Sequence, residues 1–484
     1  MQEHSKKSYK KLAREAMGNK RLQAAVQMIQ NGYGRGAQVV WENEMDPQNV
    51  RTKAKAARLR TLEHLDIVLE RLAEKIRSRG GHVYFAETAE DARNYCLEVA
   101  RKHNVHRVVK GKSMTSAEIE VDRVLEADGI EVVETDLGEF IIQQAGDAPS
   151  HIIAPCIHMD RQQVGKLFEE KLDIPYTDDP PTLTKAARKA LREKLLTAEM
   201  GLSGCNIACA ETGHVVLVSN EGNIRMSTTM PKVHMAFMGM ERVASTLAEH
   251  DMLLRLLCRG AAVQKIGTYV SFLGGPRQPG EPDGPEEFHL VIVDNGRMKM
   301  LADPRFREVL ACIRCGACLN VCPVYGRIGG HAYNSPYSGP IGAVVTPLLD
   351  GVNKHADLCQ GESQCGACKD ICPMGNDLPR MLSELRHMLA YGDSYWGVKP
   401  ASLSDSLTFK AWAAAMSSRT KYNGLIKCAR MVQKPFVKND ALRMPLGPLH
   451  KWNRTRTFPP LAKQTFAERW KTIHAKRQKE AGNE

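Results

Sequence analysis

The spacing of apolar residues predicts that the chain opens with helices. Up to about residue 77 apolar positions recur at helical intervals, most clearly at Leu62, Leu65, Val68, Leu69 and Leu72. Such a stripe forms one face of an amphipathic helix, which must be buried against another element. We therefore expect an N-terminal helical segment over residues 1–77.

Short apolar runs then alternate with helical stretches. Strands are predicted at 82–86, 107–109, 130–134 and 151–154, and helices at 90–102 and 116–127. The second helix would begin with a capping box between Thr115 and Glu118. This rhythm predicts an α/β domain with a largely parallel sheet and crossover helices, which we place at 78–298.

Polar residues follow several of the predicted strands, where the ligands of parallel sheets gather. Val109 leads into Lys110–Ser113, and Val133 leads into residues 134–136. The lysine loop lacks the G-x4-G-K-[ST] spacing of a phosphate-binding P-loop. A strand at 215–218 followed by a turn at 220–223 predicts a hairpin.

A run of cysteines carries the most specific chemistry. Cys312, Cys315, Cys318 and Cys322 precede Pro323 with the spacing C-x2-C-x2-C-x3-C-P, which is typical of ferredoxins that hold two [4Fe-4S] clusters. The pattern partly repeats at Cys365, Cys368, Cys372 and Pro373. The last cysteine of each run ligates the partner cluster. Cluster one would therefore use Cys312, Cys315, Cys318 and Cys372, and cluster two would use Cys322, Cys365 and Cys368. A four-cysteine zinc ribbon is disfavoured, since it leaves the middle cysteine and both Cys-Pro pairs without a purpose.

The fourth ligand of cluster two is open, because a perfect repeat would place a cysteine where the chain has Glu362. Cys359 could reach in through a longer loop, Glu362 could supply a carboxylate, or the cluster could keep an open iron or convert to [3Fe-4S]. Ligand type and exposure tune the reduction potential, so each alternative predicts a different electron carrier. We favour Cys359.

The other cysteines and the histidines give weaker signals. Cys205 and Cys209 form C-x3-C, but a radical-SAM motif would need a third cysteine at Thr212. Buried, apolar roles are expected for Cys96, Cys156, Cys258 and Cys428. His158, His234 and His331 have no second ligand at metal spacing and are expected to be core or surface residues.

Fourteen cysteines without a secretory signal pattern indicate thiols that serve metal in a reducing compartment, so a cytoplasmic location is expected. No apolar stretch approaches the roughly 20 residues that cross a bilayer, and Ala411–Met416 is expected to be helical. The protein is therefore expected to be soluble or peripheral on the inner face of the membrane.

The positive charge lies at the C-terminal end. Residues 397–484 hold 18 Lys and Arg against 5 Asp and Glu, whereas the whole chain is only +12. A basic extension at 393–484, with Trp412, Trp452, Phe458 and Trp470, could meet an acidic redox partner or anionic lipid. A solvated face is an alternative of equal weight. Nucleic acid ranks lower, because no helix-turn-helix or finger pattern accompanies the charge.

Several motifs in order resemble the lactate utilisation protein B family. They are the run from Cys312 to Pro323, Ile328–His331, Gly339–Ala343, Cys365–Cys372, Glu211–Gly213, Asn220–Asn223, Met238–Arg242 and Gly284–Gly296. The resemblance covers roughly residues 60–390. It departs from the family in the loop Cys359–Gln364, where the family usually has a Pro-Tyr-Ala-Ser-Ser-Leu type of sequence.

The resemblance implies a lactate-utilisation (LUD) α/β domain, similar in fold to sugar-phosphate isomerases and CoA transferases. An α-helical, ferredoxin-like domain with two [4Fe-4S] clusters would follow at 299–392. The family acts with a cysteine-rich companion and a second LUD protein to oxidise L-lactate to pyruvate without NAD, with electrons passing toward the quinone pool.

Two classes of function remain at this point. The chain could be an electron-transfer subunit of a lactate dehydrogenase complex without an active site of its own, which we favour. It could instead be an enzyme that binds a small carboxylic acid or CoA ester, with a nucleophile such as Glu211 or Glu221 facing a pocket. An iron-sulfur regulator that binds nucleic acid through the basic extension is a weaker third option.

Overall fold

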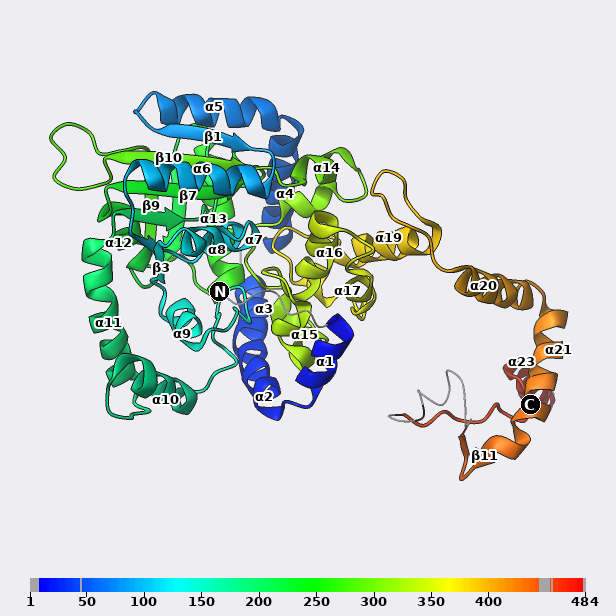
Figure 1. Cartoon of the computed structure of the whole chain (residues 1–484). Helices are drawn as coiled ribbons and strands as arrows, with labels where there is room; N and C mark the ends of the chain where they lie inside the picture. Colours follow the sequence, from blue (N-terminus) through cyan, green and yellow to red (C-terminus); the bar gives the residue numbers. More distant parts are fainter. Residues whose placement is uncertain (1–7, 44–45, 444–452, 454–455, 482–484) are drawn as a thin grey trace. The chain divides into compact units, whose positions relative to one another are not determined.

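Figure 1 shows the computed structural model, which describes residues 8–43, 46–443, 453 and 456–481. The chain divides into two units, Met1–Pro400 and Ala401–Glu484. None of the helices within the described ranges is long and apolar enough to span a membrane.

Six strands form the central sheet of the first unit. In spatial order they are β1 (His82–Ala86), β10 (Glu287–Val293), β7 (Val233–Gly239), β4 (Met200–Ser203), β2 (Arg107–Lys110) and β3 (Glu131–Glu134). Every neighbouring pair is parallel, which confirms the predicted sheet. Along β7 the side chains of Met235 and Phe237 enter one core, while those of Ala236 and Met238 enter another. A sheet buried on both faces needs helices on both sides.

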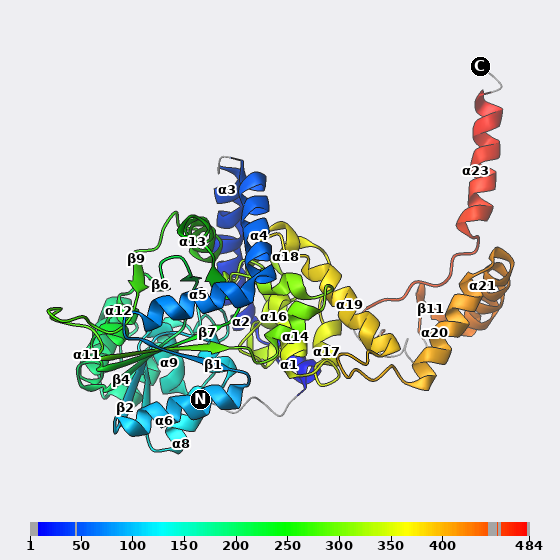
Figure 2. The ribbon, with the colours of Figure 1, turned by 90° about the horizontal axis from the view of Figure 1, so that it is seen from above.

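Helices supply this cover (Figure 2). α6 (Ala89–Lys102) and α8 (Val121–Ala127) pack on the face that carries Phe237, and α5 (Leu65–Arg77) packs on the opposite face. The other helices of this part are α7 (Met114–Glu118), α9 (Leu137–Ala145), α10 (Arg161–Leu172), α11 (Pro180–Thr197), α12 (Asn223–Thr229) and α13 (Leu247–Ala262).

The predicted N-terminal helices are present. They are α1 (Tyr9–Met17), α2 (Lys20–Ile29), α3 (Arg35–Glu42), α4 (Pro47–Glu63) and α5, with a π turn at Gln30–Gly34. Leu62, Leu65 and Leu72 are buried as the apolar stripe predicted. These helices pack on the cysteine-rich segment as well as the sheet: the Gln30 amide donates to the Cys322 carbonyl at 2.9 Å, and Lys55 pairs with Glu308 at 2.5 Å.

The cysteine-rich segment, residues 299–392, is described throughout and forms helices and turns without a strand. After α14 (Arg297–Ala302) come short 3-10 turns at 307–311, 319–321 and 331–333. The longer elements are α15 (Tyr325–Ile328), α16 (Gly339–Asp350), α17 (Ala356–Gln360), α18 (Ala367–Asp370) and α19 (Leu378–Tyr391). The predicted helical character is thus confirmed.

Four local predictions are wrong. Residues 151–154 form a bend, because the imidazole Nδ1 of His151 accepts the backbone N–H groups of Ile153 and Ala154, both at 3.1 Å. The helix predicted at 116–127 is broken into α7 and α8 at Glu120, whose φ is 53°. Ser113, not Thr115, caps α7, since its hydroxyl accepts the N–H of Ser116 at 3.1 Å.

The fourth wrong prediction is the hairpin. β6 (Val215–Ser219) pairs antiparallel with the distant β9 (Tyr269–Leu273), and the expected turn leads into α12. A further small parallel pair joins β5 (Ala208–Cys209) to β8 (Val243–Ala244). The composition of a turn does not reveal that the partner of the preceding strand comes from a distant segment.

The second unit contains α20 (Leu403–Met416), α21 (Arg419–Gln433), β11 (Val437–Lys438), β12 (Ala441–Leu442) and α23 (Phe466–Ala481). α20 confirms the helix predicted at Ala411–Met416. Trp412 and Trp470 are exposed, and Trp452 lies outside the described residues.

Candidate iron-sulfur centre and adjoining cavity

The first group of thiols consists of Cys312, Cys315, Cys318 and Cys372. Burial raises the pKa of the Cys318 thiol well above its ordinary value, and the other three thiols of the group raise it further. The pKa of Cys315 is raised by burial and then by Cys372 and Cys312. Cys315 is buried and the other three cysteines are partly buried, and thiols gathered in this way can exchange their protons for a shared metal cation. The group matches the set predicted for cluster one.

Backbone geometry shapes this group. Arg314 and Gly316 lie between the cysteines with φ of 59° and 76°, so the coil reverses direction within a few residues. The N–H of Arg314 lies 3.4 Å from the Cys312 sulfur, and the N–H of Asn376 lies 3.4 Å from the Cys372 sulfur. Hydrogen bonds to ligand sulfurs are among the features that set cluster potentials.

The second group joins Cys322, Cys365 and Cys368 to Glu362, and these four residues line one small cavity. The Cys322 thiol donates to the Glu362 Oε2 at 3.4 Å, and the Tyr333 hydroxyl donates to Oε1 at 2.7 Å. Burial raises the pKa of the Glu362 carboxyl. A carboxylate thus stands where a fourth cysteine of the repeat would stand.

Cys359 lies elsewhere. It sits on α17 in the hydrophobic core, fully buried, and does not line the cavity of the second group. Burial raises the pKa of its thiol to about 12, and no other cysteine contributes to that rise. Its carbonyl accepts the Nε–H of Arg386 at 2.9 Å. The preference for Cys359 as a ligand therefore has no geometric support, because the short helix α17 directs its side chain into the core.

The donor sets fit iron-sulfur clusters. Four thiols in the first group match one [4Fe-4S] cluster, and three thiols with a carboxylate offer four donors for a second. A structural zinc site would need one compact set of four ligands, whereas eight donors here form two adjoining groups.

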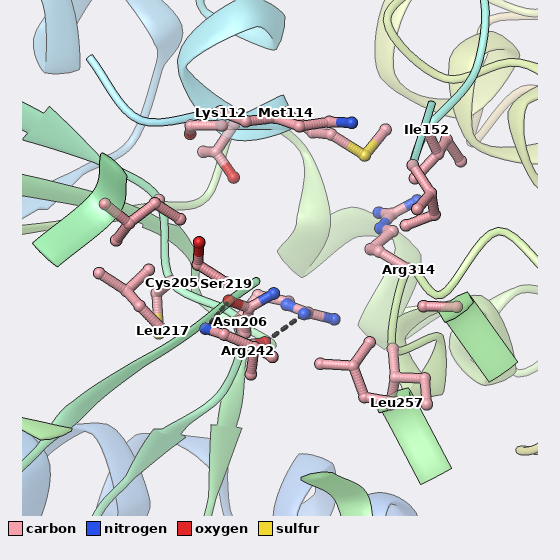
Figure 3. A pocket seen from close by; sticks show the side chains of 18 of the residues that line it. Lys112, Met114, Ile152, Cys205, Asn206, Leu217, Ser219, Arg242, Leu257 and Arg314 are labelled. Atoms are coloured by element: carbon pink, nitrogen blue, oxygen red, sulfur yellow. Dashed lines mark hydrogen bonds between the residues drawn. The ribbon is translucent and has the colours of Figure 1, made fainter. Parts of the chain in front are cut away.

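A larger cavity of about 240 Å³ adjoins the first group (Figure 3). It opens at the carboxyl ends of β2, β4 and β7, as expected for a parallel sheet. Lys112, Asn206 and Arg242 line it from the α/β side, and Arg314 lines it from the cysteine-rich segment. The predicted polar loop after β2 therefore does reach a cavity, although Lys110 itself forms buried ion pairs with Asp122 and Glu134.

Three successive parts of the chain match known protein families. Residues 69–293 match the LUD domain, 308–376 the 4Fe-4S dicluster domain, and 398–474 the lactate utilisation protein B C-terminal domain. Lactate utilization protein B of Bacillus velezensis is 42% identical over 98% of this chain and 94% of its own. The protein of that name from Bacillus cereus strain AH820 is 46% identical over 87% of each chain. This chain belongs to the lactate utilization protein B family.

Membership of the lactate utilization protein B family confirms the resemblance inferred from the motifs. It supports a role in lactate utilization, with iron-sulfur cofactors held by the dicluster segment. A DUF162 family protein from Deinococcus radiodurans aligns with 47% of this chain and 98% of its own, at 14% identity and a TM-score of 0.27. That likeness supports no statement about function.

The two candidate nucleophiles of the α/β domain are separated by the fold. Glu221 lines the cavity of this lactate utilization protein B family member, and its Oε2 accepts the Ser219 hydroxyl at 3.1 Å. Glu211 does not line it, and its carboxylate accepts the N–H of Leu247 at 2.7 Å instead. Arg242 and Arg314 also line the cavity, although no motif along the chain marks either of them as a functional residue.

The predicted places of the remaining cysteines and histidines are partly wrong. Cys96 and Cys258 are buried as expected, but Cys156 is only partly buried and Cys428 is exposed. His234 is a core residue whose Nε2 bonds the Ser203 hydroxyl at 2.8 Å. The expectation that His158 and His331 have no second metal ligand nearby is wrong. Their ring nitrogens and a carboxylate oxygen of Asp147 lie within 4.8 Å of one another. Sequence spacing could not show this, because the two histidines come from different segments.

Proposed function

We propose that this chain is the iron-sulfur electron-transfer subunit of an NAD-independent system that oxidises L-lactate to pyruvate and passes electrons toward the quinone pool. The observation that carries the proposal is the pair of adjoining thiol groups. Cys318 of the first group packs against the same hydrophobic core that contains Cys322 and Cys368 of the second group. Two clusters held there would be neighbours, so that an electron could pass directly from one to the other.

Cluster two is proposed to be held by Cys322, Cys365, Cys368 and the carboxylate of Glu362. The carboxylate lies beside the Cys322 sulfur and is fixed by the Tyr333 hydroxyl. An oxygen ligand is harder than thiolate and holds its iron less firmly against soft ligands. The iron held by Glu362 would therefore be exchanged or lost more easily than the irons held by cysteines.

Iron content and electron paramagnetic resonance test both clusters. The anaerobically purified protein is expected to hold about eight irons and about eight sulfides. Glu362→Ala should convert cluster two to a [3Fe-4S] form while cluster one keeps its signal. Cys359→Ala is the matched control and should leave both signals unchanged. About four irons in the unaltered protein, or stoichiometric zinc, would contradict two clusters; a Glu362→Ala spectrum identical to that of the unaltered protein would exclude the carboxylate.

The relay role is tested by turnover. The isolated chain should not oxidise L-lactate with artificial acceptors, whereas addition of the cysteine-rich companion and the second LUD protein should restore oxidation and reduce its clusters. Turnover by the isolated chain would favour the enzyme alternative. Reduction of the clusters by lactate only in the full assembly would support the relay.

The basic extension is proposed to dock this subunit on an acidic face of a companion or on anionic lipid at the inner side of the membrane. Within it, residues 397–484 hold 18 Lys and Arg against 5 Asp and Glu, and this excess provides the attraction. Such attraction is screened over about 8 Å at physiological ionic strength, so docking should weaken with salt.

A further inference from the structure

The cavity beside the first thiol group has features of a binding site that a relay alone would not need. Its volume of about 240 Å³ lies below the roughly 300–1,000 Å³ of sites for drug-sized ligands, so it suits a small molecule. Figure 3 shows Lys112 on one side, Arg242 on the other, and Arg314 on the wall formed by the cysteine-rich segment. Three cations thus converge from both parts of the first unit.

Among the described residues, neither Arg242 nor Arg314 donates a hydrogen bond to a carboxylate, although Glu241 forms an ion pair with Arg314 at 3.7 Å. Arg242 donates to the backbone carbonyls of Asn206 and Cys312, the latter at 3.1 Å. Within the described part of the chain, the buried Nη1 of Arg314 has no hydrogen-bond partner. Its guanidinium stacks on the Tyr337 ring at 4.4 Å, which fixes its direction. A buried donor without a partner is costly, and an anionic ligand would satisfy it.

The carboxylates of the cavity are already occupied. Glu241 receives the Nε–H of Arg297 at 2.8 Å and is 3.7 Å from the Arg314 guanidinium. Glu221 accepts hydrogen bonds from its own turn, and Asp136 caps α9. The groups left to meet a ligand are therefore the cations, which recognise carboxylate through paired N–H donors.

Apolar side chains complete the walls. Met114, Ile152, Leu217 and Leu257 line the same cavity. They leave room for a short alkyl group beside the carboxylate, while the amide of Asn206 and the Lys112 amine offer polar contacts to an oxygen next to it. This combination fits a small 2-hydroxy or 2-oxo monocarboxylic acid better than a long or purely inorganic anion.

We infer that this cavity binds a small 2-hydroxy or 2-oxo carboxylate through Arg242, Arg314 and Lys112, directly beside cluster one. Arg314 connects the two, because its side chain faces the cavity while its N–H lies 3.4 Å from the Cys312 sulfur. A bound anion disfavours addition of an electron to the neighbouring cluster, so the reduction potential of cluster one falls on binding. By linkage, the oxidised protein binds the acid more tightly than the reduced protein. The inference rests on the proposed function only in assigning a cluster to the first thiol group.

Calorimetric titration of the anaerobic full-length protein with L-lactate, pyruvate and propionate tests the site. Lactate or pyruvate should bind saturably. Each should bind about tenfold or more tightly than propionate, which has no oxygen on the carbon next to the carboxylate. Lys112→Met should weaken this binding about tenfold, as expected for loss of one charge-assisted contact. Lys185→Met, which removes an exposed lysine of α11, is the control and should change nothing.

A redox titration followed by paramagnetic resonance adds an independent measurement. A tenfold difference in affinity between oxidised and reduced protein corresponds to a potential shift of about 59 mV for a one-electron couple. Arg314→Met should abolish both binding and the shift, with iron content checking that cluster one is retained. If Arg314→Met loses its iron, the titration of Lys112→Met tests the site without it.

Several results would overturn the inference. They are the absence of saturable binding to protein with both cluster signals, equal affinity for propionate or inorganic phosphate, and unchanged binding by Lys112→Met. Saturable binding of lactate or pyruvate to protein that never holds clusters would instead contradict the proposed function and leave the ligand site standing.

Discussion

Arg58 offers a sharp test of how the N-terminal helices hold the first unit together. Its guanidinium is buried on α4, where Nη1 donates to the Val243 carbonyl at 2.6 Å and Nη2 donates to the Leu310 carbonyl at 2.9 Å and to the Glu241 carbonyl. One side chain thus ties an N-terminal helix both to the edge of the α/β domain and to the turn before Cys312. The perturbation is Arg58→Met, which keeps the length and apolar stem but removes every donor.

The expected cost follows from the three carbonyl groups left without this donor. A buried polar group without its partner costs about 1–3 kcal/mol, so three could cost about 3–9 kcal/mol. Relief from burying a charge offsets part of this, as shown by the pKa of Arg58, which burial lowers to about 10. We expect a net loss of about 2–4 kcal/mol in the free energy of unfolding.

Arg60→Met is the matched control on the same helix. Arg60 is exposed and pairs with Glu249 at 3.2 Å, an interaction worth at most about 1 kcal/mol. Urea unfolding of both anaerobic variants, followed by circular dichroism and by cluster absorbance, measures the difference. Arg58→Met should lower both transitions, because it couples the two parts. Equal, small losses for the two variants would show that Arg58 does not tie the two parts together.

Three further predictions concern pH, ligands and the basic extension. Burial lowers the pKa of His151 to about 4, below its ordinary value of about 6.5. As the pH falls, His151 of the unfolded chain is therefore protonated at a higher pH than His151 of the folded protein. The free energy of unfolding should fall by about 2 kcal/mol from about pH 7.5 to about pH 5. His151→Asn should flatten that dependence in urea titrations, and an unchanged pH profile would count against it. Cys368→Ala should abolish the cluster-two signal, while Cys359→Ala lowers only thermal stability; loss of a cluster in Cys359→Ala would restore it as a ligand. Truncation after Pro400 should keep about eight irons but remove salt-sensitive co-purification with the companions; equal recovery at low and high salt would make the charge a solvated face.

The local elements and the chemistry of the cysteines can be predicted from the amino-acid sequence alone. The strand at 82–86 is found at its predicted bounds, because its signal depends on near neighbours along the chain. The helix predicted at 90–102 differs by one residue, since α6 begins at Ala89 after Thr88 caps it. The spacing of Cys312, Cys315 and Cys318 likewise indicates its metal chemistry directly, since ligand reach along a short coil is a local property.

Tertiary structure decided which groups meet. Both Cys359 and Glu362 lie within reach of Cys365 in sequence, yet only the Glu362 side chain lines its cavity, because core packing of α17 points Cys359 away. Arg242 and Arg314 are 72 positions apart and share a cavity only through the fold. Such juxtapositions depend on long-range packing, in which each contact is fixed by many others, and no periodicity along the chain records them.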